Sequence, residues 1–265
     1  MKRSLRKLLV RSFNPLDYVA RVINGKRHLP PLHLRWDVGP LRGYEASAAE
    51  FRVYLKLFAG LKPDSRVLDI GCGCGQIARE LLQELNESGA YVGCDISREA
   101  IEWCSRNMPR FTFFWVNVAN GMYNPAGNIP AREFRVPTDF GQFDVILLKS
   151  VFTHMQKGDI ESYLNQVSTL LQPGGKCLAT FFLLNEQQRN NARAGRNLIQ
   201  FSSPKNGIAY ADIVNPEAIV ALEEAEMMEM VERCNLHVSF IKHGSWTGCK
   251  EGLSHQDLVL LELRS

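Results

Sequence analysis

Strands and helices alternate along most of this sequence, and that alternation constrains the fold more than any other feature. The strands are expected at 66–70, 91–95, 111–116, 143–148, 176–183, 237–242 and 256–263. Between most of them, apolar residues recur at helical spacing. The parallel strands are apolar throughout, as in sheets covered on both faces. No helix separates the last two strands, which should pair as a hairpin. The sequence therefore predicts an α/β fold with a doubly wound, mostly parallel seven-stranded sheet and a terminal antiparallel hairpin.

The lengths of the connections locate the expected site. In a doubly wound sheet, ligands bind beyond the carboxyl ends of the parallel strands. The long connections, 118–142, 149–157, 184–214 and 244–255, all lie at that end of the predicted strands. The connections at the opposite end are short. This asymmetry predicts a binding face built from those four segments.

Composition excludes several classes of protein. The 265 residues are 45% hydrophobic and 22% charged, which is typical of a globular chain. No apolar run reaches the length of a membrane span, and Leu8-Leu9-Val10 is too short for the apolar core of a signal peptide. Seven cysteines without a C-x-x-C pair argue against a disulfide scaffold and a zinc site. We expect a cytoplasmic protein with reduced thiols and no metal.

Charge is distributed unevenly. Residues 1–36 carry nine Lys/Arg and one acid, a net charge of +8, whereas the remainder has 22 Lys/Arg and 27 acids, a net charge of −5. We therefore divide the chain into a basic N-terminal arm, 1–44, and a main domain, 45–265, with inserts at about 118–142 and 184–214. In the arm, Leu5, Leu8, Leu9 and Phe13 have helical spacing among basic residues. Such a segment either packs on its own domain, which we favour, or makes a weak contact with an anionic membrane surface or a polyanion.

A glycine-rich turn follows the first strand and admits two cofactor classes. Gly73-Cys74-Gly75-Gln76-Ile77-Ala78 fits the dinucleotide pattern G-x-G-x-x-G/A. Asp95 lies 20 residues after Gly75, where a carboxylate accepts hydrogen bonds from ribose hydroxyls. Both nicotinamide dinucleotides and S-adenosylmethionine contain a ribose. Two further features discriminate between them, namely Asp69 just before the turn and Pro173-Gly174-Gly175 before the fifth strand.

With these motifs, the chain resembles the class I S-adenosylmethionine-dependent methyltransferases over about residues 60–183. Residues 67–75 are similar to that family's first motif, residues 143–148 to its fourth strand and residues 171–175 to its turn before strand five. The resemblance implies a Rossmann-like methyltransferase fold and S-adenosyl-L-methionine as cofactor. It implies a cofactor site at Asp69, Gly71, Cys72, Gly73, Gly75, Asp95, Ile96, Asn117, Val118, Lys149 and Ser150. Asn117 departs from the family, which often has an acid near this position.

Methyl transfer from a sulfonium is an in-line displacement, so positioning matters most, and a base is needed only for an acceptor that must lose a proton. His154, directly after the fourth strand, is the candidate base, and the alternative is that it caps or orients its loop. Aromatic and histidine side chains that could line an acceptor pocket are Trp36, Tyr44, Tyr123, Tyr210, His243, Trp246 and His255, each of which alone is better explained by packing.

The residues after the fourth strand bear on the identity of the methyl acceptor. The sequence lacks the Asn/Asp-Pro-Pro-aromatic motif of nucleobase amino-methyltransferases after the fourth strand, so we disfavour a nucleic-acid partner and expect a small-molecule or glycan- or lipid-like acceptor. An NAD(P)-dependent oxidoreductase and a non-catalytic S-adenosylmethionine-binding protein remain alternatives. The sequence does not predict the oligomeric state.

Overall fold

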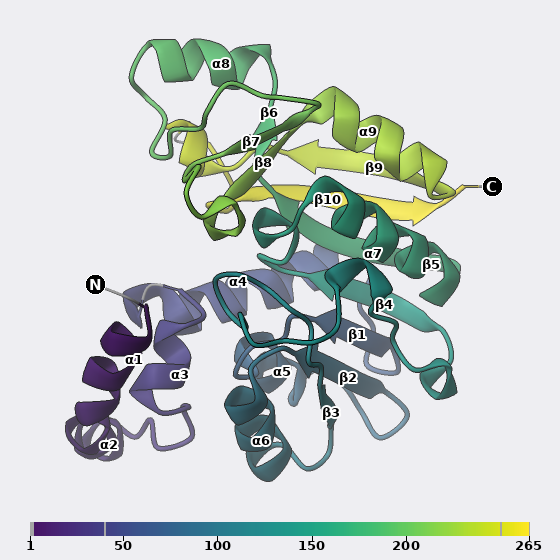
Figure 1. Cartoon of the computed structure of the whole chain (residues 1–265). Helices are drawn as coiled ribbons and strands as arrows, with labels where there is room; N and C mark the ends of the chain where they lie inside the picture. Colours follow the sequence, from purple (N-terminus) through teal and green to yellow (C-terminus); the bar gives the residue numbers. More distant parts are fainter. Residues whose placement is uncertain (1–2, 40, 250, 265) are drawn as a thin grey trace.

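A seven-stranded sheet forms the centre of the computed structural model, which describes residues 3–39, 41–249 and 251–264 (Figure 1). The strand order is β3-β2-β1-β4-β5-β10-β9. The parallel strands are β1 (Arg66–Ile70), β2 (Ala90–Asp95), β3 (Thr112–Trp115), β4 (Phe143–Leu148) and β5 (Leu171–Phe181). β10 (Asp257–Leu263) pairs antiparallel with both β5 and β9 (Leu236–Lys242). The predicted fold class and the terminal hairpin are therefore confirmed.

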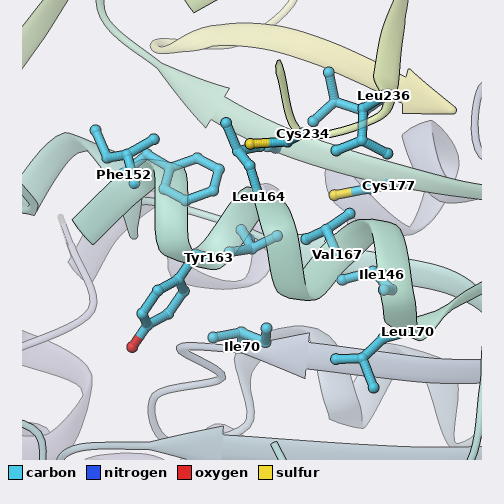
Figure 2. Packing of buried hydrophobic residues seen from close by; sticks show 14 of the residues in the cluster. Ile70, Ile146, Phe152, Tyr163, Leu164, Val167, Leu170, Cys177, Cys234 and Leu236 are labelled. Carbon is cyan, nitrogen blue, oxygen red and sulfur yellow. The ribbon is translucent and has the colours of Figure 1, made fainter. Parts of the chain in front are cut away.

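Helices cover both faces of this sheet. One face is covered by α7 (Lys157–Leu170) and α9 (Glu224–Arg233), and the other by α4 (Tyr44–Leu57), α5 (Gln76–Leu81) and α6 (Arg98–Asn107). Figure 2 shows Leu164 and Val167 of α7 among Ile146 of β4 and Cys177 of β5, all of them fully buried. Burial of side chains of this size contributes about 1.5–3 kcal/mol each, which fixes the helices against the sheet.

A second, small sheet was not predicted. It consists of β6 (Leu183–Leu184), β8 (Val220–Glu223) and β7 (Ile208–Tyr210), in that order, next to α8 (Glu186–Arg193). Strands of two to four residues are too short to show a period of two. Single turns of 3-10 helix complete the connections: η1 (Leu41–Gly43), η2 (Ala131–Glu133), η3 (Thr138–Phe140), η4 (Phe152–His154), η5 (Pro216–Ala218) and η6 (Ser245–Thr247).

The N-terminal arm folds into α1 (Arg3–Ser12), α2 (Asn14–Ile23) and α3 (Leu32–Trp36), beside α4 and α6 in Figure 1. Met1, Lys2 and the side chains of residues 3–5, which belong to the predicted basic segment, lie outside the described residues. Glu99 of α6 holds the arm, because it pairs with Arg11 and accepts a 2.7 Å hydrogen bond from His33 Nε2. Leu29 and Leu34 pack with Tyr44 and Cys74. The arm is thus anchored on the main domain. Among the described residues, no helix is both long and apolar enough to cross a membrane.

Candidate active site

A cavity of about 1490 Å³ lies at the carboxyl ends of the parallel strands. Three of the four predicted segments contribute to it: 118–142, 149–157 and 244–255. The 184–214 connection contributes no described lining residue, and Asn215 and Glu217, just beyond it, do so instead. The arm supplies a further wall, with Arg6, Lys7, Leu34, Trp36, Asp37 and Val38. The site is therefore a cavity between the sheet edge, the 118–142 insert and the arm.

The glycine turn after β1 lines one side of this cavity. Gly71 has a φ of +79°, and a Cβ at this position would lie 2.4 Å from Cγ2 of Val151. Gly73 has a φ of +56° and approaches Val38 of the arm. Because an L side chain meets both backbone strain and a clash at Gly71, only glycine fits there. The turn thus exposes its backbone to the cavity at the start of α5, as a phosphate- or nucleoside-binding loop does.

Asp95 supports that turn from the end of β2. Its Oδ2 accepts a hydrogen bond from the Gly73 amide at 2.8 Å, and its Oδ1 accepts one from the Ser97 amide at 2.7 Å. Burial raises the pKa of Asp95, and these two backbone donors oppose the shift. Each carboxylate oxygen keeps a further lone pair, so Asp95 can also accept from ligand hydroxyls on the cavity side.

A buried carboxylate and a buried ammonium line the same cavity. Asp69 is 2% exposed and accepts a 2.6 Å hydrogen bond from the Tyr91 hydroxyl. Burial raises its pKa to about 7. Lys149 Nζ donates to Gln76 Oε1 at 2.7 Å and lies over the ring of Phe51, and burial lowers its pKa to about 8. The charge of each group favours the ionised form of the other, but burial has the larger effect on both pKa values. A ligand group that carries both an ammonium and a carboxylate can supply each of them with a partner of opposite charge.

Ser150, next to Lys149, has an unusual backbone conformation. Its φ of +57° lies in the left-handed region, where a non-glycine residue is strained. The conformation is held by a 2.7 Å hydrogen bond from its amide to Thr180 Oγ1 and a 2.9 Å hydrogen bond from its Oγ to Gln256 Oε1. These bonds from β5 and from the residue before β10 turn the chain sharply at the end of β4, and they bring Val151 against Gly71.

Most of the predicted site residues meet in this one cavity. Those that line it are Asp69, Gly71, Cys72, Gly73, Asp95, Ile96, Val118, Lys149, Ser150 and His154. Gly75 and Asn117 are not among the lining residues. Gly75 is the left-handed N-cap of α5 and meets Met108 and Cys104 on its other side. Asn117 turns into the 118–142 insert, where its amide donates to Asn128 Oδ1 at 2.8 Å.

His154, the last residue of η4, lies in the wall of the cavity. Its Nδ1 is 3.1 Å from the backbone oxygen of Glu217, which can only accept, so Nδ1 carries the proton. Nε2 is then unprotonated in the neutral ring and lies 3.4 Å from the Tyr123 hydroxyl. The Asn120 side chain donates to the His154 backbone oxygen at 3.0 Å. Two segments, the 118–142 insert and the residues around Glu217, therefore hold His154 with the basic nitrogen of its ring toward Tyr123.

The weaker aromatic and histidine candidates divide into two groups. Trp36, Tyr44, Tyr123 and His255 line the cavity. Trp246 is fully buried, donates to Asp257 at 3.0 Å and packs on Phe182, while Tyr210 and His243 are likewise absent from the cavity lining. Sequence reasoning missed Asp37, Val38 and Glu217, because spacing alone does not tell which side chains of the arm and of the segment after β7 reach the sheet edge.

The sheet order, the glycine turn and the cavity at the switch between β1 and β4 define a Rossmann-like protein with a nucleoside-cofactor site. Residues 68–177 match the family described as "Methyltransferase domain". This match supports the class of S-adenosylmethionine-dependent methyltransferases that the sequence predicted, with S-adenosylmethionine as the cofactor. The nicotinamide alternative is not supported.

Three named proteins illustrate the similarity. Human tRNA N(3)-cytidine methyltransferase METTL2B is 30% identical over 125 residues, which is 46% of this chain and 30% of that protein. The chain thus spans only about a third of the length of this relative. The structure of the 1,6-didemethyltoxoflavin-N1-methyltransferase of Burkholderia thailandensis, solved with S-adenosylhomocysteine, matches with a TM-score of 0.52 at 14% sequence identity. The match covers 100% of this chain and 91% of that protein. The glycopeptide N-methyltransferase MtfA, complexed with sinefungin, has a TM-score of 0.52 at 12% identity, covering 83% and 87%.

One prediction from the sequence is wrong. The absence of a nucleobase-gripping motif led us to disfavour nucleic acid as a partner, yet curated relatives of this chain from several vertebrates are tRNA methyltransferases. The physical reason is that a motif at the end of β4 is one way to hold a base, whereas arm and insert residues also line this cavity. A missing motif therefore does not exclude that class of acceptor.

Proposed function

We propose that this chain transfers the methyl group of S-adenosylmethionine to a nitrogen atom of a nucleobase in RNA. The observation that carries the proposal is the single cavity that joins the glycine turn and Asp95 to a second wall with Tyr123, His154 and Trp36. The acceptor nitrogen is suggested by the printed names of the three proteins above, each of which specifies an N-methyltransferase or a methylated nitrogen.

The residues at the sheet edge fit the cofactor. S-adenosylmethionine supplies an electrophilic methyl on a sulfonium and carries a ribose and an amino-acid group. Gly71 and Gly73 leave the space that a Cβ would occupy, and Asp95 offers free lone pairs for ribose hydroxyls. Asp69 and Lys149 provide a buried pair of opposite charges for the amino-acid group. The arm and the 118–142 insert form the wall opposite this cofactor site.

The opposite wall suits a planar acceptor attached to a polyanion. Trp36 is 50% exposed although it lines the cavity, so its ring is available to stack on a base. Tyr123 lines the same wall and makes an edge-to-face contact with His154. Arg6 and Lys7 line the same cavity and can contact phosphates. If the acceptor nitrogen bears a proton, the unprotonated Nε2 of His154 can take it as the methyl arrives.

The test is transfer of tritiated methyl from S-adenosylmethionine by the full-length chain. Total RNA, intact or digested to nucleosides, is compared with a small-molecule metabolite extract and a glycan fraction, the acceptors expected from the sequence. We expect label in intact RNA and, after digestion, on a base nitrogen. Label confined to the small-molecule or glycan fraction would contradict the RNA acceptor.

A pair of aromatic variants sharpens this assay. Trp36→Ala should lower RNA methylation by roughly ten-fold, since loss of stacking costs about 1–3 kcal/mol per base, without changing cofactor affinity. Tyr18→Ala removes an aromatic ring of similar exposure from the same arm, outside the cavity lining, and should behave as wild type. Equal activity of wild type and Trp36→Ala would show that the base does not stack there.

A further inference from the structure

Helix α2 is turned with its polar side toward the protein and its apolar side toward solvent. Arg21 is 9% exposed, and its Nε donates to Asp17 at 2.8 Å. Arg35 of α3 pairs with the same carboxylate. On the outer side, Leu16, Val19 and Ile23 are 68%, 54% and 77% exposed. Their spacing of three and four residues places them on one stripe of the helix.

This is the reverse of an ordinary surface helix, which buries its apolar stripe. The exposed apolar residues continue back along the chain into α1. We call the set the outer arm face, and it comprises Leu8, Leu9, Phe13, Leu16, Val19 and Ile23, all between 49% and 77% exposed. Apolar surface of this extent on one short segment indicates a binding surface.

Charge restricts what can cover the outer arm face. Residues 1–36 have a net charge of +8, and their one acid, Asp17, is engaged by Arg21 and Arg35 inside the arm. The basic residues Arg11, Lys26 and Arg27 are exposed on the same segment, and two of them also pair with acids of the main domain, Arg11 with Glu99 and Lys26 with Glu45. The occupant must therefore be apolar and negatively charged at once.

We propose that α1 and α2 lie in the plane of an anionic membrane surface, with the outer arm face at the boundary between headgroups and acyl chains. Apolar side chains enter that boundary while Lys and Arg contact lipid phosphates. RNA offers negative charge but no apolar phase for aliphatic side chains, and a second copy of the arm would bring like charges together. Two helices in series also supply more apolar area than the single short helix that the sequence indicated.

The experiment is co-sedimentation of the full-length chain with vesicles of phosphatidylcholine alone or mixed with phosphatidylglycerol. We expect binding to the mixed vesicles, and at least ten-fold weaker binding of the double variant Val19→Asp/Ile23→Asp. The matched control is Val53→Asp/Leu57→Asp, a pair with the same spacing on α4 that is 42% and 71% exposed. This control should bind as wild type does, which excludes a general effect of added charge.

Three results would overturn the proposal. Wild type could fail to bind the mixed vesicles, or the Val19/Ile23 variant could bind them as tightly as wild type. In the third, wild type would not bind vesicles, and sedimentation velocity would show a dimer for wild type and a monomer for the Val19/Ile23 variant. This result would assign the outer arm face to a second copy of the chain. None of these measurements uses the methyl acceptor, so they stand apart from the proposed function.

Discussion

The two walls of the cavity are built in different ways. The cofactor wall consists of strand ends and the turn that follows β1, and its side chains are held by backbone groups, as Asp95 is held by the Gly73 and Ser97 amides. The other wall, where we propose that the acceptor binds, comes from the arm, the 118–142 insert and the loop after β4, and we call it the acceptor wall. His154 is held there by contacts among three loops. A common cofactor needs a fixed cradle, whereas the loops can change with the acceptor. Substitutions in the first wall should therefore change cofactor affinity, and those in the second should change turnover.

The largest effect is expected at His154. His154→Ala should lower turnover by roughly 10²–10⁴-fold, the contribution typical of a general base, and leave cofactor affinity unchanged. His154→Gln should restore part of the activity if the residue only positions the acceptor, and none if it takes a proton. His237→Ala, an exposed histidine on β9, serves as control. Loss of cofactor binding in His154→Ala would remove the distinction between the two walls.

Gly71 tests the cofactor wall. Gly71→Ala places a Cβ at positive φ and 2.4 Å from Val151, so the turn must move. We expect S-adenosylmethionine to bind roughly ten- to hundred-fold more weakly, as measured by calorimetry. Gly158→Ala, in α7, meets nothing within 4 Å and should leave affinity unchanged. If Gly71→Ala bound as tightly as wild type, the turn would not be the cradle.

Asp95→Ala should weaken cofactor affinity by about ten-fold or more, because hydrogen bonds to ribose hydroxyls and the support of the Gly73 amide are both lost. Asp64→Ala removes an exposed carboxylate just before β1 and is the control. Titration calorimetry distinguishes the two variants. An unchanged affinity in Asp95→Ala would remove this residue from the site.

Asp69 gives the cofactor wall a pH dependence. Burial raises the pKa of Asp69 from 3.8, the ordinary value of an aspartate, to about 7, so the folded state binds the proton more tightly than the unfolded state does. Its contribution to stability is therefore present at low pH and is lost as the pH rises toward 7. Asp69→Asn does not titrate, so its Tm should gain a few degrees on wild type between pH 5 and pH 7. A constant difference in Tm across that range would contradict the assignment.

The smallest effect on stability is expected from the arm. Residues 1–30 contact the main domain through ion pairs such as Arg11–Glu99 and Lys26–Glu45, whose partners are partly exposed, and through the buried side chain of Leu29. Deleting residues 1–30 should leave one cooperative thermal transition, with a Tm lowered by less than about 5 °C. Circular dichroism measures this directly. An unfolded deletion variant would show that the arm is part of the core.

The residues of the cofactor wall could be predicted from the sequence because they lie at the ends of strands, next to short turns. Gly71, Gly73 and Asp95 stand at the ends of strands that apolar runs already indicate, and β4 begins and ends at the predicted residues. The acceptor wall depends on long-range folding: Val38 reaches Gly73, and Glu217 reaches His154. The orientation of α2, with its polar side toward the protein, could not be predicted either, because the pattern of an amphipathic helix does not tell which side faces the protein. Asn117 follows β3, as the sequence indicated, but its side chain donates to Asn128 and does not line the cavity. The direction of that side chain could not be predicted from its position in the sequence.

The central claim is that the cavity binds S-adenosylmethionine through the glycine turn. The most direct measurement is calorimetric titration of the full-length chain with S-adenosylmethionine and, separately, with NADH. We predict saturable binding of one S-adenosylmethionine per chain and no heat of binding with NADH. Binding of NADH alone, or of neither compound, would contradict the claim.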